Sequence, residues 1–221
     1  MNRVRKQTGW EHLLEIASRE GLPERAFTWN PAVGCSNVDC EVRRRGKCWA
    51  MMMAKRFGWS FEPHLIPERL DEPLRERYSA VITPVSMGEM FDLQPNDVIK
   101  ILDVCAEAHW HVFAFLTKKP QEAVKYNFSR ISQCWFGVTV NSQNDVWRLD
   151  YLESIEGVKR YVLFEPLYGP IEYHGLQFLD LIVIGPQNYP LVQPKKEWVE
   201  SITKHVDIDH VFFKSKLKPI E

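Results

Sequence analysis

Apolar and polar positions follow two distinct patterns along this chain, and the first pattern predicts buried strands. Seven short runs, rich in β-branched and aromatic residues and apolar on both faces, are typical of strands in the middle of a parallel sheet. Such strands are covered on both sides, so little alternation between apolar and polar residues is expected. The seven runs span residues 26–30, 79–86, 111–117, 134–140, 160–166, 181–185 and 210–214.

Many segments between these runs show the second pattern, an apolar residue at every third or fourth position, which predicts amphipathic helices. The clearest cases are residues 96–108, 144–155 and 195–206. Asn96 and Asn144 stand at the starts of the first two segments and are predicted to be helix N-caps. The predicted buried faces consist of Val98, Ile101, Leu102 and Cys105, of Val146, Leu149 and Leu152, and of Trp198, Ile202 and Val206.

Strands that alternate with helices indicate an α/β fold with a parallel sheet covered by helices, either open and doubly wound or curled into a barrel. The number of strands favours a partial (β/α) TIM-like barrel of about six to seven parallel strands. No linker, repeat or low-complexity tract divides the chain, so residues 1–221 are expected to form a single domain. Within it, we predict an N-terminal helical extension at residues 1–25 and a cysteine-bearing loop at residues 31–50.

Composition and charge indicate which classes of protein this chain can belong to. A hydrophobic content of 45% is enough for a substantial core. No apolar run reaches the roughly 18 residues that span a bilayer, and the charged amino-terminal segment lacks an apolar signal region, so we expect a cytoplasmic protein without a membrane partner. Residues 1–60 carry 11 Lys or Arg against 6 Asp or Glu. This surplus suits an anionic cofactor, a nucleotide or nucleic acid, but also an ordinary solvated face.

Three of the five cysteines, Cys35, Cys40 and Cys48, lie close together after the first predicted strand. Without a secretory signal, reduced thiols are expected, and clustered thiols indicate a metal site. Zinc usually takes four ligands, so His64 would have to serve as the fourth beside the three cysteines. Three thiolates hold a [4Fe-4S] cluster and leave one iron open to a substrate or cofactor. Unrelated loop cysteines are the remaining interpretation, and the other two cysteines are predicted to be core residues.

Polar residues gather just after the ends of the predicted strands, the edge where ligands bind in both kinds of parallel sheet. Glu89 offers a carboxylate to an ammonium group, or caps the next helix. Lys118 offers a cation to a carboxylate or phosphate, or is simply solvated. The candidate binding residues at these strand ends are Ser86, Met87, Gly88, Glu89, Thr117, Lys118, Thr139 and Asn141.

Glu165 and Lys214 are the candidate catalytic residues. Glu165 ends an otherwise apolar strand, next to Pro166, and a carboxylate in that position needs a partner. Leu163 and Glu165 share one side of the strand, so Glu165 is predicted to face the mouth of the barrel. Lys214, at the end of the last predicted strand, is the expected countercharge. The pair either acts on a substrate or is a structural ion pair.

Several short elements of the chain resemble a known family. In chain order they are "FTWNPAVGC", "CWAMMMAKRFG", "VSMGEMFD", "FLTKKP", "CWFGVTVNSQ" and "LFEPLYGPI", and they are similar to the three-Cys-motif family of phages and prokaryotes, a relative of the radical S-adenosylmethionine enzymes. The resemblance covers most of residues 27–215. It implies a partial (β/α) barrel of the radical S-adenosylmethionine type, an iron-sulfur [4Fe-4S] cluster on Cys35, Cys40 and Cys48, and S-adenosylmethionine at the open iron.

The resemblance also implies an activity and residue roles. Trp49 is similar to the aromatic neighbour of the last motif cysteine, which lies beside the adenine, and residues 86–89 stand where a turn meets the methionine amino group. The implied activity is cleavage of S-adenosylmethionine to a 5′-deoxyadenosyl radical that acts on an unidentified substrate, with a ferredoxin or flavodoxin as electron donor. The chain departs from the family in its C-x4-C-x7-C spacing, in place of C-x3-C-x2-C, and at residues 185–190.

Two other functions remain open. The first is a non-catalytic barrel, with zinc or no metal at the cysteines, that associates with nucleic acid through the basic loop of residues 43–47. The lack of interleaved aromatic residues around the arginines of this loop counts against it. The second is an enzyme that uses the same sheet edge without any metal. The iron content of protein purified without oxygen distinguishes these functions from an iron-sulfur enzyme.

Overall fold

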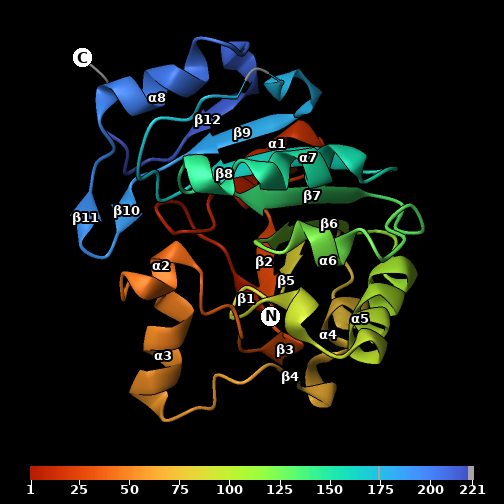
Figure 1. Cartoon of the computed structure of the whole chain (residues 1–221). Helices are drawn as coiled ribbons and strands as arrows, with labels where there is room; N and C mark the ends of the chain where they lie inside the picture. Colours follow the sequence, from red (N-terminus) through yellow and green to blue (C-terminus); the bar gives the residue numbers. More distant parts are fainter. Residues whose placement is uncertain (174, 219–221) are drawn as a thin grey trace.

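The computed structural model describes residues 1–173 and 175–218, and its main feature is one eight-stranded sheet (Figure 1). Seven strands are parallel, and β1 joins one edge by pairing with β2 in the antiparallel direction. The order across the sheet is β1-β2-β5-β6-β7-β8-β9-β12. The strands are β1 (Asn2–Arg3), β2 (Ala26–Trp29), β5 (Val81–Pro84), β6 (Val112–Thr117), β7 (Cys134–Thr139), β8 (Lys159–Phe164), β9 (Leu181–Ile184) and β12 (Val211–Phe213).

The seven parallel strands are the seven that the apolar runs predicted. They follow one another across the sheet in chain order, so every crossover leads to the neighbouring strand in the same direction. The sheet is open, because within the described residues β1 pairs only with β2 and β12 only with β9. The α/β class and the parallel sheet are therefore confirmed, whereas a closed barrel is not what this sheet forms.

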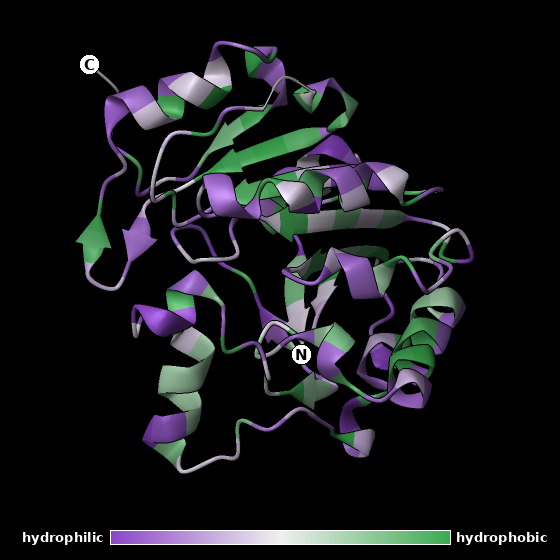
Figure 2. Cartoon of the chain, viewed as in Figure 1, coloured by the Kyte–Doolittle hydropathy of each residue, from purple (hydrophilic) through white to green (hydrophobic). Residues whose placement is uncertain are grey.

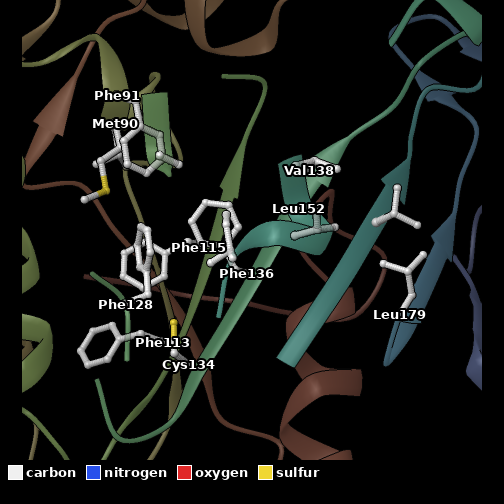
Figure 3. Packing of buried hydrophobic residues seen from close by; sticks show 14 of the residues in the cluster. Met90, Phe91, Phe113, Phe115, Phe128, Cys134, Phe136, Val138, Leu152 and Leu179 are labelled. Carbon is white, nitrogen blue, oxygen red and sulfur yellow. The ribbon is translucent and has the colours of Figure 1, made fainter. Parts of the chain in front are cut away.

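One face of the sheet packs against the connecting helices. Phe128 meets Phe115 of β6 and Phe136 of β7, with ring centroids 5.3 and 4.7 Å away (Figure 3). Figure 2 shows these strands as largely hydrophobic and the helices over them as mixed in hydropathy. All four predicted face residues of α5 are buried here, and α7 and α8 also bury apolar residues in this cluster. The helices on this side are α5 (Pro95–Glu107), α6 (Pro120–Ala123), α7 (Trp147–Ser154) and α8 (Lys196–Thr203).

The opposite face of the sheet is covered by helix α1 (His12–Arg19), whose buried residues belong to a second apolar cluster. The helix runs from the carboxyl ends of the strands toward their amino ends. Glu11, just before α1, accepts a hydrogen bond from Ser215, which follows β12. Glu20, just after α1, accepts one from Lys159, the first residue of β8. Helix α1 thus fills the face that the connecting helices leave free.

Short elements lie outside the main sheet, several of them around its carboxyl edge. Two small antiparallel pairs, β3 with β4 and β10 with β11, lie outside the main sheet. No helix in the described part of the chain has the length and apolar character needed to cross a membrane. These elements are β3 (Ala32–Val33), α2 (Glu41–Arg44), α3 (Trp49–Phe57), β4 (His64–Leu65), α4 (Glu72–Arg75), β10 (Gln187–Asn188), β11 (Leu191–Val192) and the 3-10 turns Pro67–Arg69, Met90–Asp92, Gln143–Asp145, Leu176–Phe178 and Ile208–His210.

The two predicted helix N-caps are wrong. Helix α5 starts at Pro95, so Gln94 is the cap residue and Asn96 lies inside the first turn. Proline favours the first helical position because its φ is already helical and it has no N–H to leave unpaired. Asn144 lies within the 3-10 turn that precedes α7, and Val146 occupies the cap position.

Candidate functional site

Two glycines hold the cysteine loop against the edge of the sheet. Gly34 pairs with Gly88, in the turn after β5, and backbone hydrogen bonds of 3.1 and 2.9 Å join Gly34 to the residues on either side of Gly88. A Cβ on Gly88 would lie 2.2 Å from Gly34 O, and one on Gly34, where φ is +95°, would lie 2.4 Å from Glu62 O. Only glycine allows this approach. It places Cys35, the next residue, beside the turn after β5.

The three clustered cysteines are partly buried, and none forms a disulfide. Cys40 and Cys48 stand directly before helices α2 and α3. The Asn37 N–H donates a hydrogen bond to Cys35 Sγ at 3.4 Å. Burial raises the pKa of Cys35 to about 12, with nearby acidic groups such as Asp92 acting in the same direction and the Asn37 hydrogen bond opposing them. The Cys35 thiol is therefore protonated at neutral pH.

The donor set suits an iron-sulfur cluster in its chemistry, because three thiols from one loop leave one iron of a [4Fe-4S] cluster open. Among residues 1–173 and 175–218, however, no three His, Cys, Asp or Glu side chains are grouped to hold a metal ion. Helix α2 separates Cys40 from Cys48, and His64 bonds to a backbone carbonyl at 2.7 Å.

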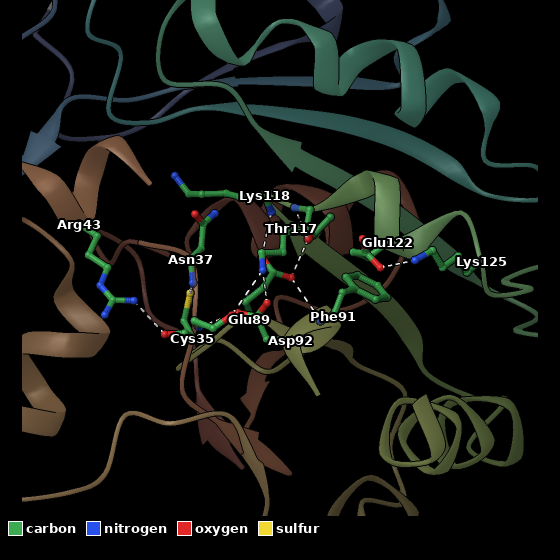
Figure 4. A network of polar contacts seen from close by, with 12 residues as sticks. Cys35, Asn37, Arg43, Glu89, Phe91, Asp92, Thr117, Lys118, Glu122 and Lys125 are labelled. Atoms are coloured by element: carbon green, nitrogen blue, oxygen red, sulfur yellow. Dashed lines mark hydrogen bonds and ion pairs between the residues drawn. The ribbon is translucent and has the colours of Figure 1, made fainter. Parts of the chain in front are cut away.

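Glu89 is buried, and its carboxylate joins the ends of β5 and β6 (Figure 4). Thr117 Oγ1 donates to Oε1 at 2.6 Å, and the Lys118 N–H donates to Oε2 at 3.0 Å. The Phe91 N–H also donates to Oε1, so Glu89 caps the 3-10 turn Met90–Asp92. Burial raises the pKa of Glu89, although these donors oppose the shift. Both carboxylate oxygens of Glu89 therefore accept hydrogen bonds from the protein, and the side chain stabilises the site by joining the two strand ends.

The adjacent lysines after β6 have different surroundings. Lys118 Nζ donates to Asn141 Oδ1 at 2.6 Å, and within the described residues it forms no ion pair. Burial lowers the pKa of Lys118. Lys119 Nζ forms an ion pair with Asp92 and lies 3.5 Å from Ser36 Oγ. An ammonium group has three donors, so Lys118 has donors to spare for an anion, whereas the charge of Lys119 is already balanced.

Thr139 and Asn141, two of the predicted binding residues, lie at the end of β7. Both are buried, while Val138 and Val140 pack in the cluster on the opposite face of the sheet. Asn141 Nδ2 donates to Pro166 O at 2.8 Å. Asn141 thus bridges the ammonium group after β6 and the loop after β8.

Glu165 and Lys214 form an ion pair across the end of the strand between them, as predicted. Asn188 Nδ2 donates to Glu165 Oε1 at 2.7 Å, and Lys214 Nζ also donates to Gly9 O. Gly185, after the intervening strand β9, leaves room for the pair, since a Cβ there would lie 3.0 Å from both side chains. The side chain of Glu165 is 8% exposed and that of Lys214 is 2% exposed. Glu165 is thus the member nearer to the surface.

An edge cleft of about 530 Å³ opens at these strand ends. Five of the predicted residues line this cleft. Four others are buried and are not part of its lining, namely Glu89, Thr117, Asn141 and Lys214. The amino-terminal residues 7–10 and residues 186–189 also line this edge cleft. The structure therefore brings together residues from five separate strand ends or loops, as the parallel sheet predicted. The five are Trp49, Ser86, Lys118, Thr139 and Glu165.

Some residues of this region were missed in the sequence. His12 is fully buried beside Lys214, and neither ring nitrogen has a hydrogen-bond partner in the described residues. Burial lowers the pKa of His12, and the charge of Lys214 adds to the effect. His12 follows charged residues in an amphipathic segment, so no local signal marks it. Asn188 follows the predicted strand at residues 181–185, and that position was its only signal.

The basic loop of residues 43–47 is partly engaged within the protein. Arg43 donates to Cys35 O at 3.0 Å, and Arg45 pairs with Glu41 and lies 4.2 Å over the ring of Tyr168. These contacts use two of its three arginines and weaken the interpretation of this loop as a nucleic-acid contact.

A family model matches residues 24–217 and carries the description "Protein of unknown function (DUF5131)". The chain belongs to the DUF5131 family. The DUF5131 segment begins just before β2 and contains the cysteine loop, the lysines after β6 and the Glu165–Lys214 pair, whereas helix α1 precedes it. Searches of curated proteins and of solved structures found no match. The family gives no activity, so the function is argued from the site.

Proposed function

We propose that this chain is a radical S-adenosylmethionine enzyme in which Cys35, Cys40 and Cys48 hold a [4Fe-4S] cluster and the edge cleft binds S-adenosylmethionine. The observation that carries the proposal is the position of the cysteine loop. It follows the first parallel strand, docks through Gly34 and Gly88 on the turn after the second, and adjoins a cleft with aromatic, cationic and acidic groups.

The topology supports the proposal. A doubly wound sheet reverses its strand order at a switch point, whereas all seven parallel strands here follow in chain order. This is the arrangement of a (β/α) barrel. We therefore infer that the sheet is a partial barrel, open between β12 and β1, with its mouth at the edge cleft.

The residues of the edge cleft match the parts of S-adenosylmethionine. Trp49 is 42% exposed and offers an indole face to the adenine ring. Lys118 has donors free for the carboxylate of the methionine portion, and Thr139 lines the same cleft. When bound, the reduced cluster supplies the electron that cleaves the cofactor and starts radical chemistry.

The acidic end of the edge cleft is the proposed substrate side. Glu165 faces the cleft and can accept a hydrogen bond or a proton from a substrate. Lys214 and Asn188 hold this carboxylate in place, so Lys214 is a positioning residue. The substrate class expected from the sequence, a nucleotide or nucleic acid, and a ferredoxin or flavodoxin as electron donor belong to the same proposal.

The proposal requires the cysteine loop to rearrange, because the three thiols are not grouped as metal ligands in the described residues. Helix α2 is four residues long and buries no side chain, so its unfolding removes little packing. Cluster assembly would therefore be accompanied by loss of this short helix and by deprotonation of Cys35.

Anaerobic reconstitution tests the cluster directly. Iron and sulfide are assayed in the native chain, in single Ala variants of Cys35, Cys40 and Cys48, and in Cys105→Ala as a control from the core. We expect about four iron and four sulfide per chain, lost in each loop variant and kept in the control. Stoichiometric zinc, or iron that survives all three loop substitutions, contradicts the proposal.

A further inference from the structure

A second cavity, of about 710 Å³, shares Trp49 with the edge cleft and is here named the aromatic cavity. Its apolar walls come from helix α3 and the loop that follows it. Phe57 and Trp59 stack with ring centroids 4.8 Å apart, although 54% and 58% of these residues are exposed. Exposed aromatic residues grouped in this way mark a binding surface. The walls consist of Trp49, Met53, Phe57, Trp59, Phe61 and Met87.

The aromatic cavity has an unpaired hydrogen-bond donor. Asn30 lines it and is 8% exposed. Its Oδ1 accepts from Ser86 Oγ at 3.2 Å and from the Met87 N–H at 2.9 Å, which fixes the orientation of the amide. The Nδ2 group donates to no atom of residues 1–173 or 175–218. This nitrogen is not among the fully buried polar atoms that lack a partner in the described residues, so it is open to the cavity and can donate to a ligand there.

Other polar groups around the aromatic cavity complement this donor. His64 Nδ1 contacts the carbonyl of Glu62 at 2.7 Å and must carry the proton, because a carbonyl only accepts. The Nε2 atom of the neutral ring is then free as an acceptor. Glu72, which lines the cavity, pairs with the amino group of Met1 at 2.7 Å, and Arg69, also in the lining, donates to Asn30 O at 3.4 Å. Both charged side chains therefore already have partners within the protein.

We propose that the aromatic cavity binds an uncharged planar heteroaromatic ring of the nucleobase class. Aromatic and thioether side chains stack on such a ring, and its edge carries the acceptors and donors that Asn30 and His64 require. A purely apolar ligand would leave the Asn30 donor unpaired. The inference rests on this cavity alone and does not depend on the cluster.

Calorimetric titration of the full chain, without cluster or S-adenosylmethionine, tests the inference. The probes are adenosine, guanosine, cytidine and uridine, with indole as a ring that lacks nucleobase acceptors. We expect saturable binding of at least one nucleoside, weakened about tenfold by Trp59→Ala and about tenfold by Asn30→Asp. Asn30→Asp keeps an acceptor for Ser86 and Met87, replaces the Nδ2 donor with an oxygen and adds a negative charge. Tyr78→Ala, at a residue 70% exposed that does not line the cavity, is the control and is expected to bind normally.

Three results would overturn the inference. The first is that no nucleoside binds saturably. The second is that indole binds as tightly as the best nucleoside and Asn30→Asp changes nothing, which identifies an unspecific apolar groove. The third is that Tyr189→Ala, in the edge cleft, removes nucleoside binding while Trp59→Ala does not. If Asn30→Asp fails to fold, Trp59→Ala decides alone, since its ring is largely exposed. Failure of cluster assembly leaves this experiment unaffected.

Discussion

Lys118 Nζ lies 2.6 Å from Asn141 Oδ1. The ammonium group thus has a neutral amide as its partner, where a lysine at a strand end would ordinarily pair with a carboxylate. Its neighbour Lys119 has found such a carboxylate in Asp92. Two adjacent side chains of the same type therefore differ in one respect that matters for binding. Lys118 has an incomplete set of partners at the wall of a cleft, and Lys119 does not.

This difference predicts unequal effects on cofactor binding. Lys118→Met is expected to lower the affinity of cluster-loaded protein for S-adenosylmethionine at least about tenfold, because a charge-assisted hydrogen bond to the cofactor carboxylate is lost. Lys119→Met is the matched control and is expected to change the affinity less than about twofold. Isothermal calorimetry measures both. Equal losses in the two variants would remove Lys118 from the binding site.

The ion pair between Glu165 and Lys214 predicts a large and reciprocal effect on stability. Lys214→Met leaves a buried carboxylate without its cation and is expected to lower the free energy of unfolding by about 3 kcal/mol. Adding Glu165→Gln to that variant removes the stranded charge and is expected to restore part of the loss. Urea unfolding measures both steps.

The exposed pair of Lys100 with Asp97 provides the control for this cycle. Lys100→Met is expected to change the free energy of unfolding by less than about 0.5 kcal/mol, because water screens an exposed pair. If Lys214→Met proves equally mild, the pair is not the buried interaction described above.

His12 predicts a pH dependence of stability. Because burial lowers its pKa in the folded chain, the unfolded chain binds a proton below its ordinary pKa of about 6.5 while the folded chain does not. Stability is therefore lost as the pH falls below that value. If His12 stays neutral in the folded chain down to pH 5, the free energy of unfolding is about 2 kcal/mol lower at pH 5 than at pH 7.5.

The matched variants are His12→Leu and His109→Leu, the second at an exposed surface site. Urea unfolding at pH 7.5 and pH 5 is expected to show a smaller drop in stability for His12→Leu than for the native chain, and an unchanged drop for His109→Leu. An identical drop in all three proteins would show that His12 is protonated in the folded state.

The close contact between Gly88 and Gly34 predicts that adding one methyl group at position 88 separates the cysteine loop from the turn after β5. In Gly88→Ala the new Cβ would lie 2.2 Å from Gly34 O, which is expected to lower the free energy of unfolding by about 1–3 kcal/mol. Faster tryptic cleavage at Arg43–Arg45 would report the released loop. Gly169→Ala, where a Cβ meets nothing within 4 Å, is the control. Unchanged cleavage in Gly88→Ala would show that the two turns are not held together by this contact.

Much of the sheet could be predicted because its signal is local. A strand buried on both faces is a short apolar run, and the ends of such runs locate residues as distant as Glu165 and Lys214 at one edge. The positions of the candidate binding residues Thr139 and Asn141 at the end of a strand could be predicted for the same reason. Their positions follow from strand geometry alone, without knowledge of any partner.

The remaining features depend on contacts that no local pattern encodes. The burial of His12 arises because α1 packs on the sheet face, which an amphipathic segment alone does not reveal. The pairing of Lys119 with Asp92 depends on how two loops meet. The incorrect cap at Asn96 arose because Pro95 was not recognised as the first helical residue. The cysteine cluster remains a prediction, since spacing along the chain does not determine where α2 places Cys40 and Cys48.

The contacts between the two ends of the chain have a consequence for synthesis. Lys214 donates to Gly9 O and Ser215 bonds to Glu11, pairs separated by more than 200 positions. During translation Gly9 and Glu11 emerge well before their partners, which are made more than 200 positions later, and contacts between distant positions form slowly. Residues 7–10 and Lys216 both line the edge cleft. A nascent chain therefore cannot complete this cleft until the residues around Lys214 and Lys216 have emerged from the ribosome.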